Sequence, residues 1–239
     1  MDKINAKTAL ITGGSKGIGF GIAASLVREG VKVGVTSRKQ EAADKAADRL
    51  NQIKPESAIG IEADVRDLDA QRKSVQQVLD KWGQLDALIA NAGLGYFASV
   101  EEMKPEHWHS TIDTNLTGVF NTVKAGVSAL KDSKGYLITI ASLAGNNFFA
   151  GGSAYNASKF GLVGFTQAVM LDLRHDGVKV TTIMPGSVST HFNDHVPGDE
   201  DSWKIQPQDM GQMVIDLLRM HPRTLPSKIE VRPSRPPKK

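Results

Sequence analysis

The chain has 239 residues, of which 40% are hydrophobic and 23% are charged, and it contains no cysteine. This is the length of one globular domain, and the absence of cysteine excludes disulfides, thiolate metal sites and a cysteine nucleophile. The net charge of +3 arises beyond Met220, because residues 1–220 carry 23 basic and 25 acidic residues. This nearly neutral body has no basic stripe, so we expect no nucleic-acid partner.

Short β-branched apolar runs alternate with longer segments of helical period, which predicts βαβ units around a parallel sheet. Seven strands and six helices in this order predict an α/β fold, a doubly wound parallel sheet of the Rossmann type. Ligands of such a sheet bind at the carboxyl ends of the strands. The predicted strands are Thr8–Thr12, Lys32–Ser37, Ala58–Glu62, Ala87–Ala90, Gly135–Ser142, Lys179–Met184 and one near Lys228–Arg232. The predicted helices are Gly17–Glu29, Lys39–Ile53, Asp69–Trp82, Pro105–Ala129, Gly152–His175 and Pro207–Met220.

The two ends of the chain carry little apolar sequence. Residues 1–7 lack the apolar core and cleavage site of a leader peptide. No stretch approaches the ~18 apolar residues that a membrane span needs, so we expect a cytoplasmic protein without a membrane partner. Residues 222–239 form a basic tail with five of the ten prolines, which predicts an extended, partly disordered end.

A glycine-rich turn follows the first predicted strand and precedes a helix. Its glycines allow a tight turn and a close approach to a phosphate, which the free N–H groups of a helix start attract. The alternative is a tight connection without a ligand, because such motifs are short. The residues that we expect to bind a dinucleotide here are Gly13, Ser15, Lys16, Gly17, Ile18 and Gly19.

The end of the second predicted strand carries Ser37 and Arg38, where dinucleotide sites often have an acidic residue that holds the ribose hydroxyls. A carboxylate there would repel a 2′-phosphate, whereas a guanidinium can bind one through two hydrogen bonds. Lys16 could add a second positive charge. We therefore expect NADP(H) in preference to NAD(H); the alternative is that Arg38 and Lys39 only solvate a helix start.

Tyr155 and Lys159 are four residues apart on a predicted helix, so both side chains project from one face. An ammonium beside a phenol favours the ionised phenol, which makes tyrosine usable for proton transfer. We place Ser142 at the end of the fifth strand, where it can donate a hydrogen bond to a substrate oxygen. Asn115, within the preceding helix, could hold water near Lys159 or be an ordinary solvated side chain.

Taken together, these motifs resemble the short-chain dehydrogenase/reductase family over nearly the whole chain. The resemblance implies one NAD(P)-binding domain over residues 1–239 and a role for each motif. Tyr155 would be the general acid in reduction and the base in oxidation, and Lys159 would bind the nicotinamide ribose and tune Tyr155. Ser142 would orient the carbonyl, and Asn115 would complete a proton relay. The motifs, in the family's order, are Thr12–Gly19, Asp64-Val65, Asn91-Ala92-Gly93, Asn115, Ser142, Tyr155-x-x-x-Lys159 and Pro185–Thr190.

The same resemblance implies the remaining cofactor contacts. Asp64 and Val65 would embrace the adenine. Asn91, Ala92 and Gly93 would line the cofactor cleft, and Pro185, Gly186, Val188 and Thr190 would hold the nicotinamide.

The expected reaction is the interconversion of a small-molecule ketone and its secondary alcohol. The glycine turn and the Asn-Ala-Gly motif resemble 3-oxoacyl-[acyl-carrier-protein] reductases, which makes an acyl thioester a candidate substrate. The C-terminus departs from that pattern, because Pro226–Pro233 replaces a segment with Asn/Asp-Gly-Gly. Two alternatives are a non-catalytic dinucleotide sensor or scaffold, and a protein that binds nucleic acid through its tail. The resemblance also implies a homotetramer or homodimer, with Pro105–Ala129 and Gly152–His175 as interface helices.

Two further segments carry no separate chemistry in this interpretation. Residues 189–205 are polar and follow a strand of the expected site, so we predict a mobile lid over the substrate. The pairs His107/His109 and His191/His195 have the spacing of metal ligands. Neither pair has the further ligands that zinc sites need, so we expect no metal site.

Overall fold

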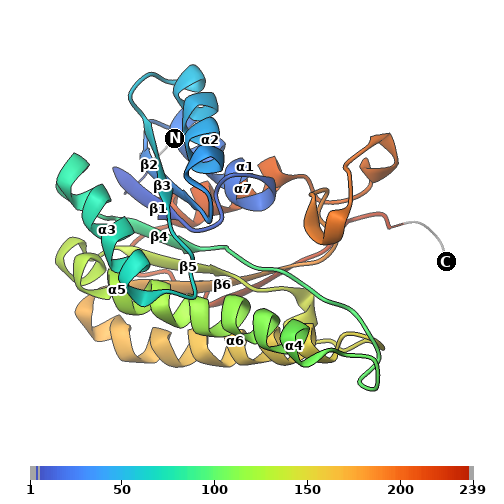
Figure 1. Ribbon diagram of the computed structural model, residues 1–239. Helices are drawn as coiled ribbons and strands as arrows, with labels where there is room; N and C mark the ends of the chain where they lie inside the picture. Colours follow the sequence, from blue (N-terminus) through green and yellow to red (C-terminus); the bar gives the residue numbers. More distant parts are fainter. Residues whose placement is uncertain (1–3, 5, 237–239) are drawn as a thin grey trace.

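The computed structural model describes residues 4 and 6–236. All seven strands are parallel and form one sheet in the order β3-β2-β1-β4-β5-β6-β7. This arrangement, with helices on both faces, confirms the predicted α/β class (Figure 1). The strands are β1 (Thr8–Ile11), β2 (Lys32–Ser37), β3 (Ala58–Glu62), β4 (Ala87–Ala90), β5 (Tyr136–Ile140), β6 (Lys179–Pro185) and β7 (Lys228–Val231). The helices are α1 (Gly17–Arg28), α2 (Gln40–Ile53), α3 (Leu68–Trp82), α4 (Pro105–Ile112), α5 (Gly118–Ser133), α6 (Ser153–Leu173) and α7 (Pro207–Arg219).

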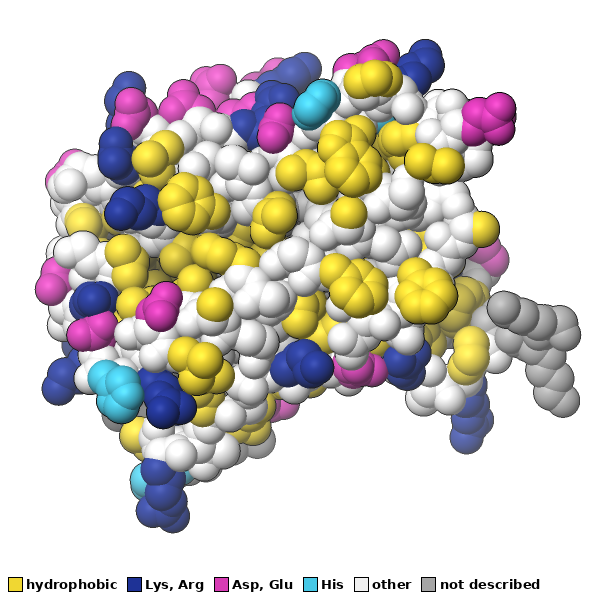
Figure 2. Space-filling view, turned by 90° about the horizontal axis from the view of Figure 1, so that it is seen from below, with side chains coloured by type: hydrophobic (Ala, Val, Ile, Leu, Met, Phe, Trp, Pro, Cys, Tyr) yellow, Lys and Arg dark blue, Asp and Glu magenta, His cyan; other side chains and the backbone are white. Residues whose placement is uncertain are grey.

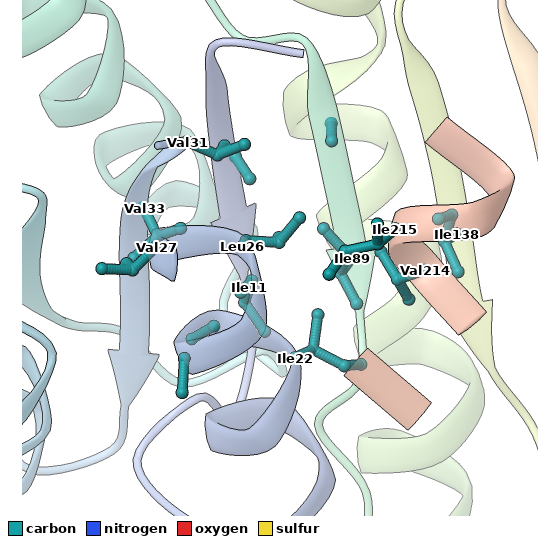
Figure 3. Packing of buried hydrophobic residues seen from close by; sticks show 14 of the residues in the cluster. Ile11, Ile22, Leu26, Val27, Val31, Val33, Ile89, Ile138, Val214 and Ile215 are labelled. Atoms are coloured by element: carbon teal, nitrogen blue, oxygen red, sulfur yellow. The ribbon is translucent and has the colours of Figure 1, made fainter. Parts of the chain in front are cut away.

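Each face of the sheet has its own hydrophobic core, because successive side chains of a strand point to opposite faces. Helices α1, α2 and α7 cover one face, and α3, α5 and α6 cover the other. Figure 3 shows the first core, where Ile22 of α1 and Val214 of α7 lie near Ile89 of β4. Full burial of one such side chain stabilises the folded state by about 1.5–3 kcal/mol. The two cores therefore hold the strands, and with them the strand ends that carry the site, in fixed positions.

The long helix predicted over Pro105–Ala129 is two helices in the structure. A π-helical turn, Asp113–Thr117, separates α4 from α5, and α5 continues to Ser133. The apolar periodicity of the two helices hides this turn, because a π turn adds one residue without breaking the helical course of the chain. Such insertions are frequent at functional sites, and this one contains Asn115.

The predicted fifth strand is also too long. It ends at Ile140, and Ser142 lies outside it as the N-cap of a 3₁₀ turn, Leu143–Gly145. The Ser142 hydroxyl accepts a hydrogen bond from the Ala144 N–H (3.1 Å), which explains why the strand stops before it. Ser142 nevertheless stays at the carboxyl edge of the sheet, where the sequence placed it.

The C-terminal segment begins with regular structure. β7 pairs with β6 from Thr182↔Lys228 to Pro185↔Val231, so the first part of the tail completes the sheet. The predictions that fall on residues 237–239 lie outside the described residues, and disorder of the tail stays a prediction. No helix among the described residues is long and apolar enough to cross a membrane.

Candidate active site

The glycine turn presents backbone N–H groups at the carboxyl edge of β1. Helix α1 begins at Gly17, and its N-cap residue, Lys16, makes no side-chain capping bond. The first N–H groups of α1 therefore keep their hydrogen-bonding capacity for a ligand. Gly13 and Gly17 have φ of 63° and 56°, a region that favours glycine over other residues.

Asn91, the residue directly after the neighbouring strand β4, holds this turn in place. Its side-chain Nδ2 donates to the carbonyl oxygens of Thr12 (2.9 Å) and Gly13 (3.1 Å). Gly19 leaves room for this contact, because a Cβ there would lie 2.5 Å from the Asn91 Nδ2 and 2.6 Å from the Gly13 oxygen. Asn91 and Gly19 thus shape the turn from behind.

The end of the cleft that adjoins β1, β2 and β3 is lined by two basic side chains and one carboxylate. Lys16 and Arg38 both line the cleft. Asp64 accepts a fork of hydrogen bonds from Arg66, and this guanidinium holds the pKa of the Asp64 carboxyl below its usual range. The one carboxylate lining the described cleft therefore has a cationic partner of its own, which leaves Lys16 and Arg38 available to an anion.

Tyr155 and Lys159 lie on α6 as the spacing predicts. Lys159 is 4% exposed, and its ammonium donates to the Ile140 carbonyl at the end of β5 (3.1 Å). Burial lowers the pKa of Lys159 from 10.5 to about 8. The pKa of Tyr155 is raised by burial, which the Ser142 hydroxyl opposes in part. The sequence analysis predicts a lowered pKa for Tyr155, because an ammonium beside a phenol favours its ionised form. In the structure burial has the larger effect on this pKa, because the apolar surroundings disfavour the phenolate.

The π turn directs the Asn115 side chain toward the end of β4. Its Nδ2 donates to the Leu94 carbonyl (2.8 Å) and to the Ser158 hydroxyl (3.0 Å), and its Oδ1 accepts from the Leu94 N–H (2.9 Å). A Cβ on Gly93 would lie 3.2 Å from this Oδ1 and 3.6 Å from the Lys159 Nζ, so the two groups flank Gly93. Asn115 therefore fixes the segment after β4 beside Lys159; its part in a proton relay stays a prediction.

One cleft of about 740 Å³ at the carboxyl edge of the sheet brings most of the predicted residues together. Gly19 and Asn115 are the two predicted residues that stand behind its wall. The predicted residues that line it are Gly13, Ser15, Lys16, Gly17, Ile18, Ser37, Arg38, Asp64, Val65, Asn91, Ala92, Gly93, Ser142, Tyr155, Lys159, Pro185, Gly186, Val188 and Thr190.

The segment 189–205 closes on itself through a carboxylate that the sequence analysis missed. Asp201 is 1% exposed, and it accepts hydrogen bonds from Ser189, His195 and Lys204, which lie at the start, middle and end of this segment. These partners hold the pKa of Asp201 far below its usual range. His195 therefore has a carboxylate partner, and the described residues contain no cluster that could hold a metal ion.

Comparisons with known proteins agree with this architecture. A profile of the short chain dehydrogenase family matches residues 7–201. The chain is 33% identical to an uncharacterized oxidoreductase of Staphylococcus saprophyticus over 98% of this chain and 100% of that protein. It is 35% identical to a 3-oxoacyl-[acyl-carrier-protein] reductase of Synechocystis over 82% of this chain and 80% of that protein. An alcohol dehydrogenase from the archaeon Thermococcus sibiricus, solved in complex with 5-hydroxy-NADP, has a TM-score of 0.90 at 28% identity, covering 98% and 100% of the two chains.

These matches span most of the chain and of its relatives. The protein belongs to the short-chain dehydrogenase family, and it is an oxidoreductase of that family.

Proposed function

We propose that this protein is an NADP(H)-dependent oxidoreductase that interconverts a ketone and its secondary alcohol. The observation that carries the proposal is the position of Tyr155 beside the buried Lys159 and Ser142, in the same cleft as the uncapped start of α1. A dinucleotide that crosses the carboxyl edge of the sheet would reach from one group to the other. A linear 3-oxoacyl thioester is one candidate substrate, as the name of the Synechocystis relative suggests.

The cleft fits a dinucleotide in shape and in charge. A Cβ on Gly13 would lie 3.0 Å from the backbone of Ala92, so only glycine leaves this part of the cleft open. The free N–H groups of α1 suit a pyrophosphate, and Lys16 with Arg38 suits a 2′-phosphate. The complex of the Thermococcus sibiricus relative with an NADP derivative supports the same preference.

The bound nicotinamide would supply or accept the hydride, and the protein would position the reactants and handle the proton. Ser142 would donate a hydrogen bond to the substrate oxygen. The raised pKa of Tyr155 keeps its phenol protonated, which suits a proton donor in the reduction. Lys159 would hold the ribose of the nicotinamide while its ammonium stays bonded to the Ile140 carbonyl.

Replacement of Tyr155 by Phe tests the proton transfer. Loss of the acid should lower the rate of ketone-dependent NADPH oxidation, followed at 340 nm, at least ~100-fold while NADPH still binds, because general acid catalysis contributes about 10²–10⁴. Tyr136→Phe is the matched control, because the Tyr136 hydroxyl is hydrogen-bonded to Thr181 (2.7 Å) and neither residue lines the cleft. A Tyr155→Phe enzyme at near wild-type rate would refute the role. Wild-type protein that binds NADPH but turns over no ketone would favour a sensor or scaffold.

Replacement of Arg38 by Asp tests the choice of cofactor. The carboxylate would repel a 2′-phosphate and could accept the ribose hydroxyls, so the ratio of kcat/KM with NADPH to that with NADH should fall at least ~100-fold. Arg174→Asp is the control, since Arg174 is an exposed arginine that does not line the cleft. An unchanged ratio in Arg38→Asp would contradict the NADP(H) assignment.

We further propose that the protein self-associates as a homodimer or homotetramer. The interface would be the face formed by helices α4, α5 and α6. Large apolar side chains stay exposed there, among them Trp108, Phe120, Phe160 and Leu171. Figure 2, which views the molecule from the underside of Figure 1, shows hydrophobic side chains gathered over this face. Exposed apolar patches of this kind typically mark interfaces. Light scattering on the purified protein should give a molar mass above that of one chain.

We also propose that residues 189–205 act as the substrate lid of a single domain that spans residues 1–239. The bridge between Val188 and Ile205 closes the base of this segment, and His191, Phe192 and His195 line the cleft. A closed base with a hydrogen-bonded interior would let the segment move as a unit.

A further inference from the structure

We infer that this enzyme selects small, uncharged ketones that carry a flat ring, and that Phe97, Phe149 and Phe192 form the surface that recognises the ring. The inference rests on the proposed function, because it places the substrate beside Tyr155. It names a substrate class that differs from a linear 3-oxoacyl thioester.

Phe97 and Phe192 flank the side chain of Tyr155, and Phe192 also lines the cleft. The Tyr155 ring lies 5.5 Å from that of Phe97 and 5.7 Å from that of Phe192, centroid to centroid, at 66° and 56°. The Phe97 and Phe192 rings are 6.3 Å apart, and Phe149 extends the group outward at 5.8 Å from Phe97. These are the separations and tilts of favourable aromatic pairs. A fourth ring that entered beside them would find the same kind of partner.

The rings come from three separate connections: the one after β4, the one after β5 and the one after β6. These connections are far apart in sequence, yet they bring Phe97 and Phe192 against the ring of Tyr155 and Phe149 against Phe97. Gly95 allows this convergence, since a Cβ there would lie 2.8 Å from Phe192 and 2.9 Å from Phe97. Space has therefore been left for the two rings next to Tyr155.

Their exposure shows that the rings are not simply core residues. Phe97 is 40% exposed, Phe149 is 48% exposed and Phe192 is 38% exposed, although they contact one another. Exposed clusters of large apolar side chains typically mark a surface that a binding partner or a ligand covers. Because this surface adjoins Tyr155, the ligand that covers it would be the apolar part of the substrate.

The charges near the rings argue against an anionic substrate. Two lysines line this end of the described cleft: Lys159, whose ammonium donates to the Ile140 carbonyl, and Lys204, which forms an ion pair with Asp201. His195 bonds the same carboxylate. An anionic group would have to compete with Asp201 for both partners, whereas a neutral ring would leave the cluster undisturbed. The observations together favour an uncharged ring ketone.

The test compares 1-indanone, a flat bicyclic ketone, with ethyl 3-oxobutanoate, a linear 3-oxo ester, by NADPH oxidation. The wild-type kcat/KM should be at least ~10-fold higher for 1-indanone, and Phe97→Ala or Phe192→Ala should reduce that preference about 5- to 20-fold, the range expected for loss of one well-packed aromatic contact. Phe148→Ala is the matched control, because Phe148 precedes Phe149 but is 86% exposed and belongs to none of these ring pairs.

Equal turnover of the two ketones, a preference for the linear ester, or a preference unchanged in both alanine variants would overturn the inference. If neither ketone is turned over, calorimetric titration of 1-indanone into the NADP⁺-loaded protein decides the inference separately from the proposed function. Binding that Phe97→Ala weakens and Phe148→Ala does not would retain the ring site. Absence of binding, or binding equally strong in Phe97→Ala, would reject it.

Discussion

The two ends of the cleft are formed by different kinds of chemical group. The end that we propose for the cofactor, called the cofactor end, consists of the glycine turn, which Asn91 holds by its carbonyl oxygens, and of the cations Lys16 and Arg38. The substrate end consists of half-exposed aromatic rings and a segment that is closed by one carboxylate, Asp201. Ligand binding at the cofactor end depends on backbone positions that tolerate only small displacements. At the substrate end it depends on apolar area and on one charge cluster.

This difference has a physical reason. A backbone cradle has few alternative arrangements, because an added methyl group meets other backbone atoms that cannot move independently. Side chains on loops can rotate, so a change in one ring leaves its neighbours free to adjust. Substitutions at the cofactor end should therefore affect binding steeply, and substitutions at the substrate end should alter selectivity with modest losses.

Among substitutions in the glycine turn, Gly19→Ala should have the steepest effect on cofactor affinity. The new Cβ would lie 2.6 Å from the Gly13 oxygen and 2.5 Å from the Asn91 Nδ2, so the glycine turn must shift. We expect NADPH affinity, measured by fluorescence titration, to fall about 30- to 100-fold, equal to about 2–3 kcal/mol. Gly164→Ala is the control, since a Cβ at that helical position meets no atom within 4 Å. An affinity that is equal in the two variants would contradict the rigid cradle.

Lys159, where the two ends meet, should show its burial in the pH dependence of stability. Its pKa is lowered to about 8 in the folded chain and is near 10.5 when exposed. The folded state therefore gives up the proton first, and the penalty for burying the charge is complete below pH 8 and disappears above pH 10.5. Wild-type stability should rise with pH across this window.

The variant Lys159→Met removes this titration. Its unfolding free energy relative to wild type should be about 2 kcal/mol more favourable at pH 7 than at pH 10, by urea denaturation at both pH values. Lys124→Met provides the control, because that side chain is exposed in the folded chain. A relative stability that does not change with pH would show that Lys159 keeps its ordinary titration in the folded protein.

The cofactor end could be predicted from sequence because its residues lie in short motifs directly after strands. The apolar runs place Gly13 and Ser37 at the carboxyl ends of β1 and β2, and four-residue spacing places Tyr155 and Lys159 on one face of α6. Local order in the chain thus becomes proximity in space through the parallel sheet alone.

The substrate end could not be predicted in this way. Phe97, Phe149 and Phe192 are far apart in sequence and have no shared spacing, so their convergence depends on loop conformations. Asp201 stands among several acidic residues that look alike in sequence, and only the folded segment distinguishes the buried one. The π turn at Asn115 is hidden for a similar reason, since periodicity on either side of it continues.

The smallest effect that we predict concerns this segment. Asp201→Asn leaves Lys204 and His195 without their carboxylate, but these side chains are 19% and 34% exposed, so water replaces part of the lost interaction. We expect about 1 kcal/mol of lost stability and a KM for the ketone raised about 3- to 5-fold at unchanged kcat, because a looser lid weakens binding without touching Tyr155. Asp199→Asn, in the same 3₁₀ turn but exposed, is the control. A drop in kcat as large as that in Tyr155→Phe would mean that Asp201 acts on the reaction itself, and the contrast between a rigid cofactor end and an adaptable substrate end would fail.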